Sequence, residues 1–399
     1  MSGTLARYTG SSFLNPLFPA RRIYAPGPTM APLEVLQRLA QPPLHHRTPE
    51  FGEMLGRVRE NLQLVFRTTQ PCYVFSSSGT GALEACMVNL LSPQDEMLVL
   101  NGGKFGERWA ELGQAFGCRV HMLEVPWGSV PDPQVLRDTL KKNPNVHSVW
   151  MQACETSTTV CYPIRELASV VHEASNALVI VDAVSSLGAD PLEMDAWGID
   201  AMVSGSQKAL MLPPGLSFLA LSPAARARSE SSRLPRFYFD LKREDAALQT
   251  GETAFTTSVS LVAALDLVLT EIKRIGMEAL WEHHARLAGA FRSGAKAMGL
   301  SFYAQSHPSN VVTGLLGPAA LPNTSDLIRY ARDAFQLTLA EGQGKAKGKM
   351  FRVAHVGSMD SLDTIGMLSA LEMALHRCTQ GAFPTQLGLS TAAAMGEFL

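Results

Sequence analysis

Asp200-Ala-Met-Val-Ser-Gly-Ser-Gln-Lys-Ala-Leu-Met-Leu-Pro-Pro-Gly215 is the stretch on which the fold of this chain turns. An apolar strand at 201–203 leads through small residues to a single lysine, Lys208, and the two prolines and the glycine that follow prevent a continued helix. The apolar neighbours of Lys208 predict a buried side chain. Burial lowers the pKa of a lysine, and a neutral amine can attack a carbonyl carbon to form a Schiff base. The alternative is an ordinary strand end with a solvated lysine, and this stretch alone leaves both open.

A second strand end carries a carboxylate. The run Ala177-Leu-Val-Ile-Val-Asp182 is apolar until its last residue, which is typical of a buried parallel strand. Ligands of open α/β sheets bind at the carboxyl ends of the strands, so we expect Asp182 and Lys208 to face one crevice. This pair suits pyridoxal 5'-phosphate (PLP), because a lysine can hold its aldehyde while a carboxylate keeps its pyridine nitrogen protonated.

At these two places the chain resembles a known family. Val181-Asp-Ala-Val-Ser-Ser-Leu-Gly188, followed by Ser204-Gly-Ser-Gln-Lys-Ala-Leu210, is similar to the class V aminotransferases of fold type I, and most of all to the alanine–glyoxylate and serine–glyoxylate (serine–pyruvate) aminotransferases. The resemblance runs from about Tyr24 to about His376. It implies an α/β fold with a mostly parallel sheet sandwiched by helices and a smaller C-terminal α+β domain. We expect an N-terminal arm at 1–23, a large PLP-binding domain at 24–276 and a small domain at 277–399.

A Ser/Gly-rich turn predicts a phosphate site. In Cys72-Tyr-Val-Phe-Ser-Ser-Ser-Gly-Thr-Gly-Ala-Leu-Glu84 a strand enters the turn, and a helix begins at about Gly81. Free N–H groups and the dipole at a helix N-terminus favour phosphate, although a simple capped helix start would give the same pattern. The stretch resembles the phosphate loop of the family. The resemblance implies that Ser78, Gly79 and Thr80 bind the cofactor, together with Gln207 beside the lysine.

Three further cofactor contacts follow from the resemblance. Phe105, in the turn after the strand at 96–100, matches an aromatic residue that stacks on the cofactor ring, whereas core packing is the alternative for a lone phenylalanine. Ser157 matches a residue expected to hydrogen-bond the ring oxygen or the network of the aspartate. Thr159 stands where the family usually has glycine. Thr256 is the best match for a threonine that reaches the phosphate of the neighbouring subunit, which implies a homodimer with shared sites.

Arg352 is the predicted substrate-binding residue. It lies between apolar neighbours in a strand at 350–354, after a glycine- and lysine-rich loop. A buried guanidinium needs an anionic partner and grips a carboxylate with two hydrogen bonds. The matching arginine of the family binds the α-carboxylate of the substrate. A structural ion pair is the alternative.

Composition limits the other possibilities. The 399 residues suit two domains, and 46% hydrophobic with 18% charged residues suits a folded enzyme. A formal net charge of −2 gives no electrostatic case for nucleic acid or an anionic membrane. No apolar run reaches the ~18 residues of a membrane span. The six cysteines form no C-x-x-C pair, which predicts free thiols in a reducing compartment and a cytoplasmic protein.

The N-terminal segment, a pair of adjacent histidines and the C-terminal tail support only weak predictions. The first 33 residues hold three arginines and no acidic residue, which can mark an organelle transit peptide, but their prolines make us favour a packing arm. The stretch His45-His46-Arg47 lacks the spacing of metal ligands, so we predict no metal. We assign no role to the tail after Cys378.

The resemblance implies transamination by a ping-pong mechanism. Lys208 would carry the cofactor and move the substrate proton, with alanine or serine as donor and glyoxylate or pyruvate as acceptor. Three alternatives stay open. The enzyme could use another donor (aspartate, ureidoglycine or a phosphonate), it could be a lyase of the same fold, or the chain could be a non-catalytic subunit. No G-x-G-x-x-G opens a strand–helix unit, which disfavours a nucleotide-binding oxidoreductase.

Overall fold

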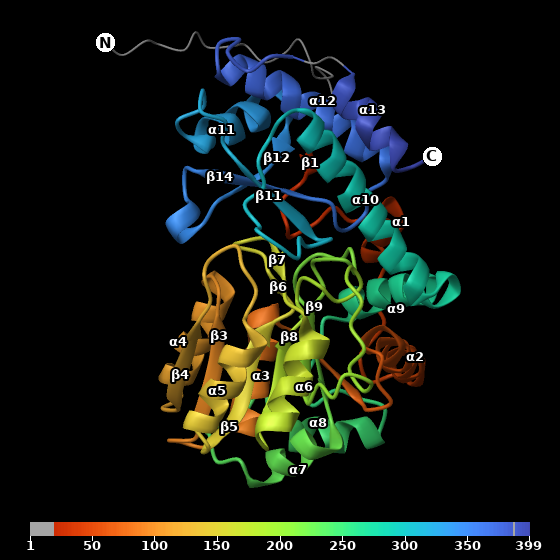
Figure 1. The fold of residues 1–399 in the computed structure, drawn as a ribbon. Helices are drawn as coiled ribbons and strands as arrows, with labels where there is room; N and C mark the ends of the chain where they lie inside the picture. The colour runs from red at the N-terminus through yellow and green to blue at the C-terminus, as the bar shows by residue number, and fades with distance from the viewer. Residues whose placement is uncertain (1–19, 386–387) are drawn as a thin grey trace.

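The structure is a computed structural model, described here for residues 20–385 and 388–399 (Figure 1). The expected arm at 1–23 therefore lies almost wholly outside the described residues. Within them, no helix has the length and apolar character needed to cross a bilayer.

The main sheet has seven strands in the order β2-β10-β9-β8-β5-β3-β4. β10 is antiparallel to both of its neighbours, and all the other pairings are parallel. This confirms the mostly parallel sheet that the resemblance implies. The strands are β2 (Cys72–Phe75), β3 (Glu96–Asn101), β4 (Arg119–Glu124), β5 (Val146–Gln152), β8 (Leu178–Asp182), β9 (Ala201–Gly205) and β10 (Ser217–Leu221).

Helices cover both faces of this sheet, because alternate residues of each strand point to opposite sides. In β3, for example, Leu98 and Leu100 pack into one apolar core, whereas Met97 and Val99 pack into the other. The first core is covered by α2 (Pro49–Phe66), α5 (Pro133–Lys142), α6 (Ile164–Ala174) and α9 (Val259–Ile275), with α1 (Leu33–Leu39) beside them. The second is covered by α3 (Gly79–Leu90), α4 (Lys104–Ala115), α7 (Pro223–Ser231) and α8 (Leu241–Gln249).

The C-terminal part has a core of its own, above the main sheet in Figure 1. Its antiparallel sheet has the order β11-β14-β13, with β11 (Val312–Leu316), β13 (Ala340–Glu341) and β14 (Met350–Ala354). Around it lie α10 (Met277–Ala297), α11 (Thr324–Phe335), α12 (Ser361–Cys378) and a short 3-10 turn η1 (Gly344–Ala346). The sequence predicts this α+β composition, while the domain boundaries stay predictions.

The tail after Cys378, to which the sequence led us to assign no role, contributes to the C-terminal core. It forms α13 (Leu389–Gly396), which packs against α10 and α12. Ser390 is buried there and donates a hydrogen bond to the buried carboxylate of Glu372 at 3.1 Å. The tail was hard to interpret because eight residues with few large apolar side chains give little helical periodicity.

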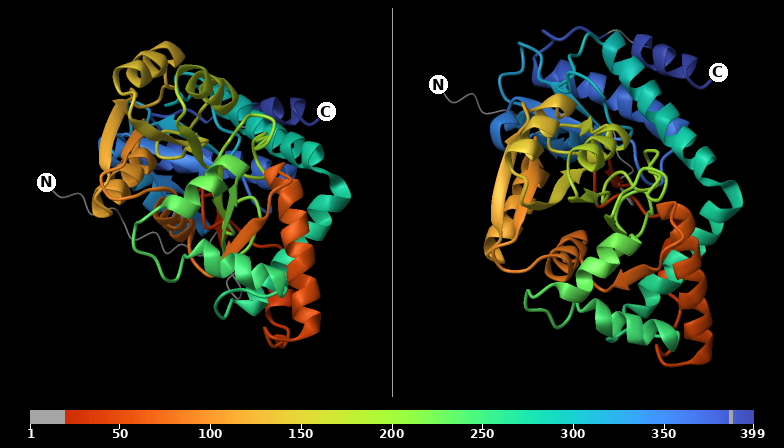
Figure 2. Two further views of the ribbon diagram at one scale, coloured as in Figure 1. Left: turned by 90° about the horizontal axis from the view of Figure 1, so that it is seen from below. Right: turned by 60° about the horizontal axis from the view of Figure 1, so that its bottom comes forward.

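Two small pairings join distant parts of the chain. β1 (Arg22–Ile23) lies parallel to β12 (Leu337–Thr338), which brings the N-terminal segment onto the C-terminal part. β6 (Cys154–Glu155) and β7 (Val160–Cys161) form a short antiparallel hairpin just after β5. Figure 1 shows this hairpin where the main sheet meets the C-terminal part, and β1 beside β12 within that part. Figure 2 shows the C-terminal part, in blue, from two further directions.

Candidate active site

Lys208 follows the carboxyl end of β9, and its side chain is buried as predicted. Its Nζ atom donates a hydrogen bond to the carbonyl oxygen of Pro26 at 2.7 Å. Desolvation lowers the pKa of Lys208 to about 8, although a nearby buried thiol and carboxylate oppose the shift. A neutral amine is therefore accessible near physiological pH, which decides against the solvated lysine of the alternative interpretation.

The segment around Gly27 closes over this lysine. Gly27 has a φ of +148°, and a Cβ atom added there would lie 2.4 Å from the Nζ atom of Lys208. Thr29 fixes the segment, because its hydroxyl donates to the carbonyl of Lys208 at 2.9 Å and its N–H group donates to that of Gln207 at 3.1 Å. Periodicity could not predict this contact with the lysine, because the segment is irregular and lies about 180 residues away in the chain.

Asp182 ends β8, the strand next to β9. Burial raises the pKa of Asp182 to about 6, while a hydrogen bond from the Val184 N–H group at 2.8 Å, Arg108 and Lys208 hold it down. The carboxylate is thus ionised at neutral pH inside a closed site. It and Lys208 line the same cavity of about 190 Å³, as the two strand ends predict.

Five more predicted residues line this cavity: Ser78, Gly79, Thr80, Phe105 and Gln207. Ser78 is the N-cap of α3, yet among the described residues its hydroxyl caps no backbone N–H group. That observation favours a ligand over a simple capped start. A Cβ atom on Gly79 would lie 2.9 Å from the Val184 side chain, so the glycine leaves room at the cavity. The buried Oε1 atom of Gln207 has no partner in the described chain.

Arg108 is a site residue that the sequence analysis missed. It lines the cavity of Lys208 and a neighbouring cavity of about 560 Å³, and its guanidinium lies 4.9 Å from the centre of the Phe105 ring. Arg108 makes no ion pair with any described carboxylate. Its spacing from Phe105 could have predicted it. Residues three apart on a helix lie on one face, and Phe105 was already predicted to face the cofactor from α4.

Arg352 lies in β14 and is buried, as predicted. Its guanidinium donates to backbone carbonyls alone, through Nη1 to Thr156 at 2.8 Å, and through Nε at 3.1 Å and Nη2 at 2.8 Å to Glu341. Within the described residues it has no carboxylate partner, so the structural ion pair of the alternative interpretation is absent there. Burial lowers its pKa to about 10, and the side chain lines the 560 Å³ cavity.

Two predicted residues lie outside the cavity of Lys208. Ser157 is fully buried in the turn of the β6–β7 hairpin, where its hydroxyl donates to Glu155 Oε1 at 2.5 Å and accepts from the Lys104 N–H group at 3.0 Å. Thr256 is exposed, and its hydroxyl lies 3.5 Å from His46 Nε2. A surface position suits a residue that acts on a neighbouring subunit, and that role stays a prediction.

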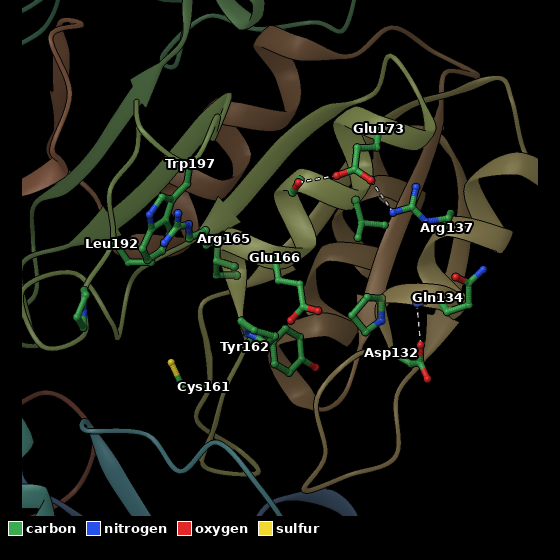
Figure 3. Close-up of a pocket in the computed structure, with 16 residues that line it drawn as sticks. Asp132, Gln134, Arg137, Cys161, Tyr162, Arg165, Glu166, Glu173, Leu192 and Trp197 are labelled. Atoms are coloured by element: carbon green, nitrogen blue, oxygen red, sulfur yellow. Dashed lines mark hydrogen bonds and ion pairs between the residues drawn. The ribbon is translucent and has the colours of Figure 1, made fainter.

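Another cavity lies apart from these residues. It measures about 810 Å³ and lies between α5 and α6, with Cys161 and Trp197 at its edges (Figure 3). No predicted site residue lines it, and the Arg137–Glu173 ion pair at 2.6 Å crosses its rim. In residues 20–385 and 388–399, no three His, Cys, Asp or Glu side chains gather as metal ligands would.

Comparison with known proteins identifies the family. The model of aminotransferase class V matches residues 24–311. The chain belongs to the class V aminotransferases. This family uses PLP, and the buried lysine and aspartate of the cavity agree with that cofactor. The chain is therefore an enzyme of this family, with the α/β fold of the PLP enzymes of fold type I.

Relatives of this class V aminotransferase carry several names. It is 38% identical to the soluble hydrogenase 42 kDa subunit of Anabaena cylindrica, over 92% of this chain and 96% of the relative. It is 32% identical to the L-aspartate–glyoxylate aminotransferase of Paracoccus denitrificans, over 94% and 96%. The ureidoglycine–glyoxylate aminotransferase of Bacillus subtilis superposes with a TM-score of 0.90 at 26% identity, over 96% and 98%.

Proposed function

We propose that this class V aminotransferase moves an amino group from a small amino acid, alanine or serine, to glyoxylate or pyruvate by a ping-pong mechanism. The observation that carries the proposal is the pairing of Lys208, whose pKa burial lowers to about 8, with the buried carboxylate of Asp182 in one cavity. The glyoxylate acceptor is supported by the names of two relatives, from Paracoccus denitrificans and Bacillus subtilis.

The residues of the cavity fit PLP. Ser78, Gly79 and Thr80 would hold its phosphate at the N-terminus of α3, with the unpartnered Gln207 side chain beside them. Phe105 would pack on its ring. When bound, the cofactor supplies an electron sink for the negative charge that develops on the substrate α-carbon. We extend the proposal to Ser157, which would act on this network through the turn in which it lies.

Asp182 and Lys208 perform the proton chemistry in this proposal. The ionised carboxylate of Asp182 would face the pyridine nitrogen and favour its protonated form. The Nζ atom of Lys208 would accept the α-proton of the donor as a base and return a proton as an acid. A pKa of about 8 suits both steps, because the neutral and the protonated amine are both populated between about pH 7 and 9.

Arg352 would bind the α-carboxylate of the donor. A guanidinium that is buried without an anionic partner gains most from a ligand that brings one. Its three hydrogen bonds go to backbone carbonyls, and the buried carboxylate of Glu155 acts on its charge from beyond ion-pair distance, so no carboxylate occupies the guanidinium. We also propose a homodimer, in which exposed Thr256 of one subunit reaches the phosphate in the other.

The test is an absorbance titration of the PLP-loaded protein with L-alanine, L-serine and L-aspartate. We expect the visible band of the bound cofactor to bleach with a small donor and to recover with glyoxylate or pyruvate. Lys208→Ala is the control and should lack both the native band and the bleaching. A band that is unchanged in Lys208→Ala, or that no amino acid bleaches, would contradict the proposal.

A second candidate has specific support. Arg108 and Arg352 are both free of ion pairs in the described chain, and both line the 560 Å³ cavity. Two unpaired guanidinium groups suit a dicarboxylic donor, and the relative from Paracoccus denitrificans is named for L-aspartate. Bleaching by L-aspartate at much lower concentration than by L-alanine, lost in Arg108→Gln, would favour this candidate.

A non-catalytic subunit is the candidate from another class. Its support is the name of the Anabaena cylindrica relative, a hydrogenase subunit. A protein of this kind has no need of a buried lysine and aspartate in one cavity. The same titration distinguishes the two candidates. In a non-catalytic subunit, none of the amino acids would bleach the visible band of the cofactor.

A further inference from the structure

Glu155 is a buried carboxylate that neither the proposed chemistry nor the sequence analysis uses. Its side chain is fully buried, and every hydrogen bond to its two oxygens has Glu155 as the acceptor. Oε2 accepts from the N–H groups of Phe105 at 3.0 Å and Gly106 at 3.1 Å. Oε1 accepts from the N–H group of Ser157 at 3.2 Å and from its hydroxyl at 2.5 Å. Burial raises the pKa of Glu155, and these four donors oppose the shift because each favours the ionised carboxylate.

These bonds attach the β6–β7 hairpin to the start of α4. The first N–H groups of a helix have no partner within the helix, and the N-cap residue, Gly103, has no side chain to supply one. Glu155 and Ser157 satisfy the N–H groups of the first three helical residues, 104–106. A Cβ atom on Gly103 would lie 2.6 Å from the Glu155 carboxyl carbon, so the approach requires glycine. Glu155 therefore fixes the position of Phe105 in the first turn of α4.

The opposite side of the same turn contacts the C-terminal part. The carbonyl of Thr156, the residue after Glu155, accepts from Nη1 of Arg352 at 2.8 Å. Thr159 accepts through its hydroxyl from the Gly314 N–H group at 3.2 Å and through its carbonyl from that of Ser309 at 3.2 Å. The hairpin is thus hydrogen-bonded to the helix that carries Phe105 and to the strand that carries Arg352.

We propose that Glu155 is a positioning residue that fixes Phe105 and Arg352 relative to each other through the hairpin turn at 155–159. The consequence is that seating of the cofactor ring and recognition of the substrate carboxylate depend on one side chain that touches neither. This inference rests on the proposed function, because it assigns Phe105 to the ring and Arg352 to the carboxylate.

A purely local role of Glu155, as a cap for α4, is the competing explanation. It predicts a loss of stability and a shifted Phe105, but no change in how Arg352 selects a carboxylate. The two explanations therefore differ in the selectivity for carboxylates, and a readout of that selectivity decides between them.

The test uses two reagents that attack the aldehyde of bound PLP without any transamination. Aminooxyacetate carries a carboxylate and methoxyamine does not, so the ratio of their rate constants measures carboxylate recognition. The rates are followed by the absorbance of the PLP-loaded protein, for wild type, Glu155→Gln, Arg352→Lys and the double variant. Glu372→Gln is the matched control, because Glu372 is a buried glutamate on α12, remote from the cavity.

We expect Glu155→Gln to lower the preference for aminooxyacetate about tenfold to a hundredfold, the scale on which small displacements act, while Glu372→Gln leaves it unchanged. We expect the double variant to lose little more than Arg352→Lys alone, because both changes act on one contact. The visible circular dichroism of the bound cofactor should weaken in Glu155→Gln as Phe105 shifts. Glu155→Asp provides the same comparison if the glutamine variant does not fold.

An unchanged preference in Glu155→Gln, or additive losses in the double variant, would overturn the inference and leave a local cap. Failure of the wild type to transaminate any donor would count against the proposed function alone. The reagent ratio would still test Glu155, since it requires bound cofactor and no turnover.

Discussion

At the scale of single residues, the site is a set of charges whose states are set by burial. Lys208 and Asp182 are both desolvated, which favours the neutral form of each. The pKa of Lys208 is therefore lowered to about 8, and that of Asp182 is raised to about 6. Between about pH 6 and pH 8 the two side chains carry opposite charges, and each charge stabilises the ionised form of the other residue. Two types of residue at two strand ends were enough for the sequence to predict the pair.

The first prediction concerns the pH dependence of cofactor loading. The amine of Lys208 attacks only when neutral, and its lowered pKa makes that form dominant above about pH 8 instead of above 10.5. The rate at which the apoprotein takes up PLP should therefore rise with pH and level off above about 8, as measured by stopped-flow absorbance. A rate that still climbs steeply towards pH 10 would show that the lysine is solvated.

Arg352 gives a second prediction, on stability. Breaking a buried ion pair leaves a bare charge and costs about 3–5 kcal/mol. Arg352→Met removes three hydrogen bonds to backbone carbonyls but breaks no described ion pair, so the loss should stay below that of a broken buried pair. Donor KM should rise by about a hundredfold or more, because the charge-assisted pair with the donor is lost. A large fall in melting temperature with an unchanged KM would instead indicate an internal ion pair.

At the scale of elements, long periodic segments were predictable and short contacts were not. The strand expected at 350–354 is β14 with the same bounds, and the strands expected at 96–100 and 201–203 match β3 and β9 to within two residues. The β6–β7 hairpin, the cap that Glu155 makes on α4, and the contact between Pro26 and Lys208 were missed. Each depends on tertiary packing of two to five residues, which leaves no period in the sequence.

The segment at 24–32 gives a prediction at this scale. Gly27→Ala adds a methyl group 2.4 Å from the Nζ atom of Lys208, at a φ of +148° that L-residues avoid. We expect PLP affinity to fall at least tenfold while the far-ultraviolet circular dichroism stays unchanged. Gly56→Ala is the control, because no described atom lies within 4 Å of a Cβ added there. Equal PLP affinity in both variants would show that the segment does not constrain the lysine.

At the scale of the whole molecule, the site lies where two cores meet. Lys208, Asp182 and the N-terminus of α3 belong to the main sheet, whereas Arg352 comes from the C-terminal sheet (Figure 1). Local sequence patterns do not determine how two sheets face each other. This arrangement was therefore predicted from the family resemblance alone. The oligomeric state belongs to the same scale, and exposed Thr256 makes it testable.

The prediction for the dimer uses mixed subunits. If Thr256 acts on the site of its neighbour, Thr256→Val should weaken PLP binding severalfold without touching the cavity of its own chain. Refolding it together with Lys208→Ala should restore tight sites that combine an intact lysine with a partner's threonine. Binding that stays weak in the mixture, or a monomer by analytical ultracentrifugation, would contradict shared sites.

The pairing of β1 with β12 has a consequence for how the molecule is made. The residues at 22–24 bond to the backbone at 336–338, and the carbonyl of Tyr24 accepts from the N–H group of Ala354. A nascent chain exposes the first partner more than 300 residues before the ribosome delivers the second. The residues at 22–24 therefore cannot pair until translation is nearly finished. Pro26 and Thr29 bond to Gln207 and Lys208, which emerge far earlier, so a truncated product would hold the segment over the lysine at one end only.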